Sequence, residues 1–206
     1  MRPDLEAIVR WVPPGARVLD LGCGDGSLLR HLWQERQAPG YGVEIEDGRV
    51  IACVANDVNV IQADLESGLS LFGDRSFDCV ILSLTLQAMR HQEALLREML
   101  RVGREAIVSF PNFGHWSARL QVMLGRMPVS STLPYEWYET PNLHHCTITD
   151  FEDLCRKIGI RIGERLVLHG GRPVTLLPNL LGSVADRKST RLNSSHRLLS
   201  RMPSSA

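Results

Sequence analysis

The chain has 206 residues, a length that suits one α/β domain with a sizeable buried core. Its 23 basic and 23 acidic residues balance, but residues 1–185 alone hold 18 basic and 22 acidic side chains. This mildly acidic body without a basic stripe argues against nucleic-acid binding, which depends on Lys and Arg. No run approaches the roughly 20 apolar residues of a membrane span.

The cysteines indicate a reducing compartment. They are odd in number, show no CxxC spacing and follow no apolar leader at the start of the chain; they are Cys23, Cys53, Cys79, Cys146 and Cys155. We therefore expect free thiols in a cytoplasmic protein.

Strands and helices alternate over the first half of the chain. Helical spacing at 5–11 stops at a Pro-Pro-Gly turn, and an apolar strand at 17–21, a glycine loop and an amphipathic helix over 27–36 follow. The next expected elements are strands over 40–44, 58–62, 77–82 and 105–110 and helices over 46–55 and 92–100. This order predicts an α/β fold, a doubly wound, mostly parallel Rossmann-like sheet with its ligand crevice at the carboxyl ends of the strands.

Residues 111–148 interrupt this alternation with a long segment rich in aromatic residues and proline. Loops of this length inside a domain are usually functional or contain structure of their own, and 118–127 suits a short helix. After it, Thr149 is the expected N-cap of a helix through 158, and 160–168 is the expected next strand.

The glycine-rich turn Asp20-Leu21-Gly22-Cys23-Gly24-Asp25-Gly26 joins the first strand to its helix. Glycines allow close approach of a ligand, and the helix N-terminus favours an anionic group. A dinucleotide pocket would need GxGxxG, and its third glycine would fall on Ser27. The spacing therefore favours a methyl-donor pocket in which Asp20 receives the amino group and Gly22, Cys23 and Gly24 line the ligand.

Acidic residues after the next two strands extend this pocket. Glu44, followed by Ile45, stands at the end of the second strand, where a carboxylate can accept both hydroxyls of a ribose. Asp64 follows the third strand, where it can receive an adenine amino group while Leu65 packs on the ring. Ser83 closes the fourth strand. We expect these residues to bind the cofactor, S-adenosylmethionine or its demethylated product.

The end of the fourth strand carries no acceptor motif. Residues 82–87 contain no [Asp/Asn]-Pro-Pro-aromatic sequence, and no Pro-Cys nucleophile is visible. Methylation of base or glutamine amino groups is thus disfavoured, and the catalytic residues and the acceptor remain unassigned.

Three further runs carry a more specific resemblance. Residues 110–116, 133–142 and 144–151 resemble the MetW family of methionine biosynthesis within the class I methyltransferase superfamily. The resemblance implies a protein that acts with homoserine O-acetyltransferase or succinyltransferase as an accessory or regulatory subunit. The alternative is an active small-molecule methyltransferase that depends on positioning of the acceptor.

The end of the sequence differs in composition. Residues 186–206 are rich in Ser and Arg, lack apolar periodicity and resemble translated sequencing-adapter DNA, although a genuine basic tail is the alternative. Similar methyltransferases insert a last strand between strands five and six, and 180–185 would begin it. We therefore predict a domain over 1–185, a disordered and artefactual tail over 186–206, and a truncated last strand that leaves its neighbours unpaired.

Other polar and aromatic residues have two interpretations each. His115 and Trp116 either cover the pocket or anchor their loop. The aromatic residues of 135–138 form either a partner surface or a small core of the loop. Adjacent His144 and His145 lack a second ligand cluster, so we expect no metal site.

Overall fold

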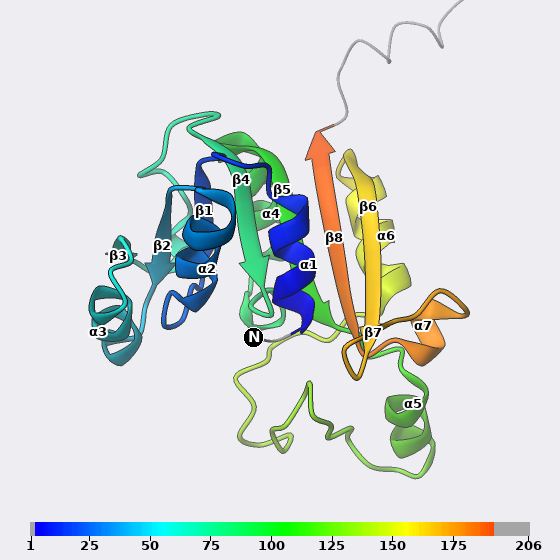
Figure 1. Ribbon diagram of the computed structural model, residues 1–206. Coiled ribbons are helices and arrows are strands. Elements are labelled where there is room, and N and C mark those ends of the chain that lie inside the picture. Colours follow the sequence, from blue (N-terminus) through cyan, green and yellow to red (C-terminus); the bar gives the residue numbers. More distant parts are fainter. Residues whose placement is uncertain (1–2, 192–206) are drawn as a thin grey trace, which may run out of the picture.

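The computed structural model describes residues 3–191 and has one eight-stranded sheet in the order β3-β2-β1-β4-β5-β8-β6-β7 (Figure 1). The strands are β1 (Val18–Leu21), β2 (Gly40–Glu44), β3 (Val60–Gln62), β4 (Phe77–Ser83), β5 (Gly103–Pro111), β6 (Ile160–His169), β7 (Arg172–Pro173) and β8 (Val184–Arg191). Strands β1 to β5 pair in parallel, and β8 runs antiparallel to both of its neighbours. The predicted doubly wound, mostly parallel sheet is confirmed.

Helices cover both faces of this sheet (Figure 1). They are α1 (Pro3–Trp11), α2 (Ser27–Arg36), α3 (Asp47–Ala55), α4 (Gln92–Val102), α5 (Trp116–Met123), α6 (Ile148–Lys157) and α7 (Pro178–Leu181), with short 3-10 turns η1 (Leu65–Ser67) and η2 (Leu86–Ala88). Two apolar cores result, because successive strand residues point to opposite faces. Val18, Ile81 and Ile107 pack against α1 to α3, whereas Leu19, Leu82 and Val108 belong to the core beneath α4 and α6.

The parallel strands end at one edge of the sheet. Leu21 of β1 lies opposite Val43 of β2 and Leu82 of β4, so the residues that follow these strands meet there. The segment 112–147, including α5, lies beyond the same edge in Figure 1. This is where an open α/β sheet binds its ligands.

The expected truncation of the last strand is wrong. Residues 186–191, which the composition places in an unstructured tail, continue β8, and this strand pairs with β6 over 184–191 and with β5 over 184–189. Asp186, for example, lies opposite Ser109 and Leu166. The remainder of the predicted tail, 192–206, lies outside the described residues.

Polar contacts explain how residues 186–190 of this strand, which have no apolar side chain, are buried or half-buried. Asp186 and Arg187 are 0% and 2% exposed. Arg187 Nε donates to Glu152 Oε1 at 2.9 Å, and Lys188 Nζ lies 3.0 Å from Glu105 Oε2. A strand needs partners for its backbone, and side-chain hydrogen bonds can satisfy the charges that it buries. The absence of apolar periodicity therefore did not exclude a strand at 186–191.

Three local predictions also change. Thr147, not Thr149, caps α6 through a capping box with Asp150. Helix α5 starts at Trp116 and ends at Met123, before the expected 127. Residues 180–181, expected in the last strand, belong to α7, whose first residue is Pro178.

Within residues 3–191, no helix combines the length and the apolar character needed to cross a membrane.

Candidate functional site

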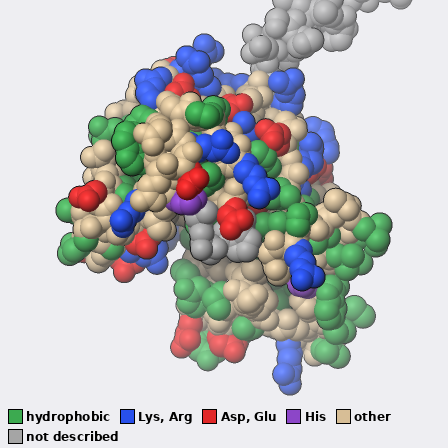
Figure 2. Space-filling view, viewed as in Figure 1, with side chains coloured by type: hydrophobic (Ala, Val, Ile, Leu, Met, Phe, Trp, Pro, Cys, Tyr) green, Lys and Arg blue, Asp and Glu red, His purple; other side chains and the backbone are tan. Residues whose placement is uncertain are grey.

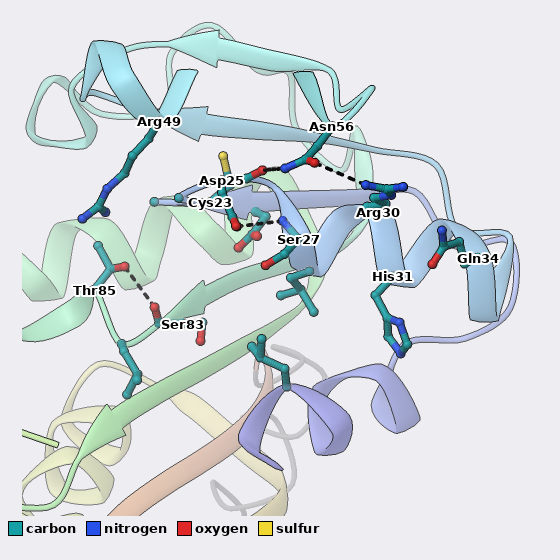
Figure 3. Close-up of a pocket in the computed structure, with 16 residues that line it drawn as sticks. Cys23, Asp25, Ser27, Arg30, His31, Gln34, Arg49, Asn56, Ser83 and Thr85 are labelled. Carbon is teal, nitrogen blue, oxygen red and sulfur yellow. Dashed lines mark hydrogen bonds between the residues drawn. The ribbon is translucent and has the colours of Figure 1, made fainter. Parts of the chain in front are cut away.

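A pocket of about 750 Å³ opens at the carboxyl ends of β1 and β4 and along α2 (Figure 3). It is lined by Leu5, Asp20, Gly22, Cys23, Gly24, Asp25, Ser27, Leu28, Arg30, His31, Gln34, Arg49, Asn56, Ser83, Leu84 and Thr85. Five of the predicted cofactor residues are therefore brought together, namely Asp20, Gly22, Cys23, Gly24 and Ser83.

The glycine loop has a backbone that other residues rarely adopt. Gly22, Gly24 and Gly26 have φ of 70°, 61° and 77°, in the left-handed region. A Cβ on Gly22 would lie 2.7 Å from Thr85 Oγ1, whereas one on Gly24 would meet no atom of the described residues within 4 Å. The loop therefore needs glycine at position 22 for two reasons, conformation and close approach to the loop after β4.

Glu44 holds this loop in place. Its carboxylate accepts backbone N–H groups from Gly24 at 2.9 Å, Ile45 at 2.8 Å and Glu46 at 3.2 Å. The side chain is only 5% exposed and is not in the pocket lining. Oε2, which accepts the Gly24 N–H and lies 3.9 Å from Arg49, keeps capacity for a ligand hydroxyl.

Charges of both signs surround the pocket. Asp20 is 2% exposed at the end of β1, and Arg49 reaches towards the pocket from α3 in Figure 3. Asp25 Oδ1 accepts the Ser27 N–H at 3.0 Å, which holds the pKa of Asp25 below its ordinary value. Arg30 donates to Asn56, whose amide in turn donates to the Asp25 carbonyl. Such a lining suits a ligand with both an ammonium and a carboxylate group.

The other predicted cofactor residues lie outside the lining. Asp64 caps η1 by accepting the Glu66 N–H at 2.9 Å, and Ile45 is 60% exposed. Leu65 packs partly buried against the core beneath α4. These three residues are absent from the lining of this pocket, although the Ile45 N–H and the Gly24 N–H both bind the Glu44 carboxylate.

Sequence reasoning missed the part of the pocket formed by α2. Arg30, His31 and Gln34 line it from successive turns of that helix (Figure 3). They follow Ser27 by three, four and seven residues, a spacing that could have identified them because such residues share one helix face. Leu84, with φ of 53°, and Thr85 were also missed.

The pocket thiols are unsuited to nucleophilic attack. Cys23 Sγ lies 3.7 Å from Cys53 Sγ, and burial raises the pKa of both thiols. Cys23 also fits tightly, since a Cβ on Gly42 would collide with its sulfur. In the described part of the chain, no group of three or more His, Cys, Asp or Glu side chains could hold a metal ion.

His115 does not cover the pocket. Its Nδ1 accepts the Ser117 N–H at the start of α5, and its ring stacks on His169 with centroids 4.8 Å apart. This arrangement favours the interpretation that His115 anchors its loop. Trp116 is 50% exposed and likewise absent from the pocket lining.

Segment 116–143 exposes an apolar surface, which we call the aromatic face. Trp137 and Tyr138 pack edge to face and are 68% and 66% exposed, so they form no buried core. Figure 2 shows hydrophobic side chains gathered on the part of the molecule beyond the strand ends. The face includes Trp116, Leu120, Met123, Leu124, Trp137 and Tyr138, all at least 45% exposed.

The sequence comparisons identify the family. The model of the family described as methionine biosynthesis protein MetW matches residues 2–185. The chain belongs to the MetW family. It is 40% identical over 173 residues to the bifunctional methionine biosynthesis protein MetXA/MetW of Rhodopirellula baltica, a match that covers 79% of this chain and 28% of that protein. It is also 33% identical over 113 residues to the ubiquinone/menaquinone biosynthesis C-methyltransferase UbiE of Pseudomonas putida. That match covers 48% of this chain and 43% of the relative, so the chain spans less than half of the length of both relatives.

Solved structures agree on the fold. A putative S-adenosylmethionine-dependent methyltransferase from Listeria monocytogenes superimposes with a TM-score of 0.69 at 15% identity, covering 93% of this chain and 99% of that one. The corresponding enzyme from Mesorhizobium loti gives a TM-score of 0.67 at 19% identity, covering 92% and 96%. This MetW family member therefore has the Rossmann-like methyltransferase fold. The family match ends at 185, the second residue of β8, so most of the strand that completes the sheet lies beyond it.

Proposed function

We propose that this chain binds S-adenosylmethionine, or S-adenosylhomocysteine, and acts as an accessory or regulatory subunit of a homoserine O-acetyltransferase or succinyltransferase. The observation that carries the donor assignment is the glycine loop held to Glu44 beside the buried Asp20. We further propose a cytoplasmic setting, supported by five thiols without disulfide partners.

The residues present fit this cofactor. A pocket of about 750 Å³ lies within the usual range for small-molecule sites of about 300–1,000 Å³. Asp20 would receive the ammonium group, Gly22 and Gly24 would allow close approach of the methionine part, and Glu44 Oε2 would accept a ribose hydroxyl. We assign Ile45, Asp64 and Leu65, which follow β2 and β3 at the same edge of the sheet, to the adenine end of the cofactor. When bound, the cofactor would supply an electrophilic methyl group.

The name of the Rhodopirellula relative supports the partner assignment. That protein combines MetXA and MetW in one polypeptide, and fusion keeps two modules at a high effective concentration. The aromatic face is the docking surface that we propose here. Exposed Trp and Tyr side chains such as Trp137 and Tyr138 are the residues that most often dominate binding energy at protein interfaces.

Hydrogen bonds connect the donor pocket with this face. Gln87 of η2 accepts the N–H groups of Leu143 and His144 at 2.9 and 3.0 Å through its backbone carbonyl. Its side-chain amide donates to the carbonyl of Leu84, at 2.6 Å, and Leu84 lines the pocket. A change at Leu84 on donor binding would therefore reach the segment that carries Trp137 and Tyr138, which supports a regulatory role.

A second candidate function is methyl transfer to a small acceptor. His31 and Gln34 extend the pocket beyond the glycine loop, and an acceptor could bind beside them. In this case the chain's residues would orient the acceptor and exclude water.

Calorimetric titration with S-adenosylmethionine, alone and with the acyltransferase, distinguishes these functions. We expect saturable binding whose dissociation constant changes on addition of the acyltransferase, because linked sites alter each other's affinity reciprocally. Steady release of S-adenosylhomocysteine with a defined acceptor would instead establish that the chain is a methyltransferase. Absence of any binding would refute both.

The docking surface has its own test. Replacing Trp137 with Ala should weaken acyltransferase binding by about 30-fold, the loss typical of an interface hot spot of about 2 kcal/mol, and leave donor affinity unchanged. Trp33→Ala is the matched control, since Trp33 is 54% exposed but lies on α2. Equal effects of the two substitutions would contradict the assignment.

A further inference from the structure

Arg49 places a positive charge beside the carboxylate of Glu44. It lies on α3 and lines the donor pocket, and its side chain is 57% exposed. Its Nη1 is 3.9 Å from Glu44 Oε2, too far for a hydrogen bond, while its Nε is 2.8 Å from Glu46 Oε2. Figure 3 shows the side chain pointing from α3 towards Thr85, which lines the pocket after β4. Arg49 therefore brings charge to the pocket without taking part in the hydrogen bonds that hold the glycine loop.

The charge of Arg49 also reaches the glycine loop. Asp25 of this loop has a lowered pKa, chiefly because it accepts hydrogen bonds from Ser27, and the positive charge of Arg49 adds to this effect. Arg30, on α2, lines the pocket too, but its guanidinium is hydrogen-bonded to the Asn56 side chain. Arg49 is thus the arginine of the described lining that lies next to the proposed ribose carboxylate.

The two proposed ligands differ at one atom. S-adenosylmethionine carries a positive charge on a sulfur bonded to three carbons, whereas the sulfur of S-adenosylhomocysteine lacks the methyl group and is uncharged. In both molecules this sulfur joins the amino-acid part to the ribose. Under the proposed function Asp20 receives the ammonium group and Glu44 receives a ribose hydroxyl, so the sulfur belongs between these two carboxylates.

Charges of both signs act on a sulfur in this position. The buried carboxylates of Asp20 and Glu44 attract a sulfonium more strongly than an uncharged thioether. Arg49 repels the sulfonium and leaves the thioether unaffected, since a like charge disfavours only the charged form. Because Arg49 is largely exposed and shares its charge with Glu46, solvent and ions screen this repulsion. It should therefore change the affinity severalfold and not by orders of magnitude.

We propose that Arg49 is a specificity-determining residue that shifts the pocket towards the uncharged product, S-adenosylhomocysteine, an inference that rests on the proposed function. One pocket then binds both molecules, and the charge at residue 49 sets their relative affinities. A regulatory subunit with such a pocket responds to the ratio of donor to product and not to the concentration of the donor alone.

Calorimetric titration with each ligand gives the ratio of the two dissociation constants, donor over product. Arg49→Met, which keeps the length of the side chain and removes its charge, should lower this ratio about fivefold. Arg49→Lys keeps the charge and should keep the ratio within about twofold of its value in the natural sequence. The matched control is Arg156→Met, because Arg156 on α6 also forms an i,i+3 ion pair, with Asp153, but lies outside the lining. It should leave the ratio unchanged.

Two further measurements separate charge from shape. At about 0.5 M NaCl the difference between the natural sequence and Arg49→Met should shrink, because salt screens exposed charges. Glu46→Gln removes the carboxylate that shares the charge of Arg49, so it should raise the ratio. This variant keeps the test valid if Arg49→Met does not fold, since an unchanged or lower ratio in Glu46→Gln would then overturn the proposal.

The ratio distinguishes a charge effect from a structural one. A merely structural role of Arg49 would weaken both ligands alike, and an unchanged ratio in Arg49→Met overturns the proposal. So does an equal change in Arg156→Met, or a fall in Arg49→Lys as large as that in Arg49→Met. Failure of the natural sequence to bind either ligand would refute the proposed function together with this inference, whereas binding of both with a ratio independent of residue 49 refutes this inference alone.

Discussion

Replacement of Gly22 with Ala tests the geometry of the glycine loop most sharply. The alanine would have a φ of 70°, and its Cβ would lie 2.7 Å from Thr85 Oγ1 and 3.0 Å from Thr85 Cγ2. Left-handed backbone costs a residue with a Cβ about 1–2 kcal/mol, partly offset by the lower entropy of the unfolded chain, and overpacking adds about 1–3 kcal/mol. We expect Gly22→Ala to lower the free energy of unfolding by about 2–4 kcal/mol.

The matched control is Gly24→Ala, because Gly24 has φ of 61° but a Cβ added there would have no atom of residues 3–191 within 4 Å. Gly24→Ala should lower the free energy of unfolding by only about 1 kcal/mol, the contribution of the backbone alone. Urea unfolding followed by circular dichroism measures both values, and a double-mutant cycle with Thr85→Ala isolates the contact. In the Thr85→Ala background Gly22→Ala should cost no more than Gly24→Ala. If Gly22→Ala and Gly24→Ala are equally costly in the natural sequence, the close approach of the two loops is wrong.

Three other predictions follow from contacts and titration. Glu44→Gln should lower the free energy of unfolding by about 1–3 kcal/mol in urea titrations, since an amide NH₂ cannot accept the backbone N–H groups that bind Glu44. The control Glu46→Gln, at an exposed side chain, should lower it by at most about 1 kcal/mol. A larger loss for Glu46→Gln than for Glu44→Gln would contradict the anchoring role. Arg187→Ala should lower the free energy of unfolding by about 3 kcal/mol, and Arg187→Met should lower it less, because Met fills the buried volume. Equal losses of stability in thermal unfolding would argue against a packed β8. The lowered pKa of His115 means that, below its ordinary value of 6.5, the unfolded chain binds a proton that the folded chain does not, so stability should fall as pH drops from 7.5 to 5.5 and fall less in His115→Phe. An identical pH dependence in that variant would refute the assignment.

The order of strands and helices could be predicted from the sequence because local patterns determine it. Apolar runs such as 77–82 and the glycine loop after 17–21 are signals within a few residues of one another, and the parallel sheet follows from their alternation. The five predicted residues around Asp20 and Ser83 meet for the same reason, since strand ends converge at one edge.

The prediction failed where structure depends on distant partners. Strand β8 has a polar sequence, and its burial rests on Glu152 of α6 and Glu105 of β5, which no local pattern connects to Arg187 or Lys188. Besides the ribose contact proposed for it, Glu44 has a use that the sequence did not indicate, because its carboxylate accepts the backbone N–H groups of Gly24, Ile45 and Glu46. The side chain of a strand-end acid can serve the loop as well as the ligand, and the sequence does not distinguish these uses.

The stacking of His115 on His169 could not be foreseen for a related reason. These residues are more than 50 positions apart, and the turn at Gly170 and Gly171 follows His169 directly. The sequence indicated only that His115 has some role in its loop.

The central claim is that a methyl-donor pocket regulates a partner enzyme through the aromatic face. Calorimetric titration of the chain with S-adenosylmethionine, with and without saturating homoserine acyltransferase, measures this directly. We expect a single saturable site whose affinity differs at least fivefold between the two conditions, a coupling of about 1 kcal/mol. An affinity unaffected by the acyltransferase, although the two proteins form a complex, would contradict it.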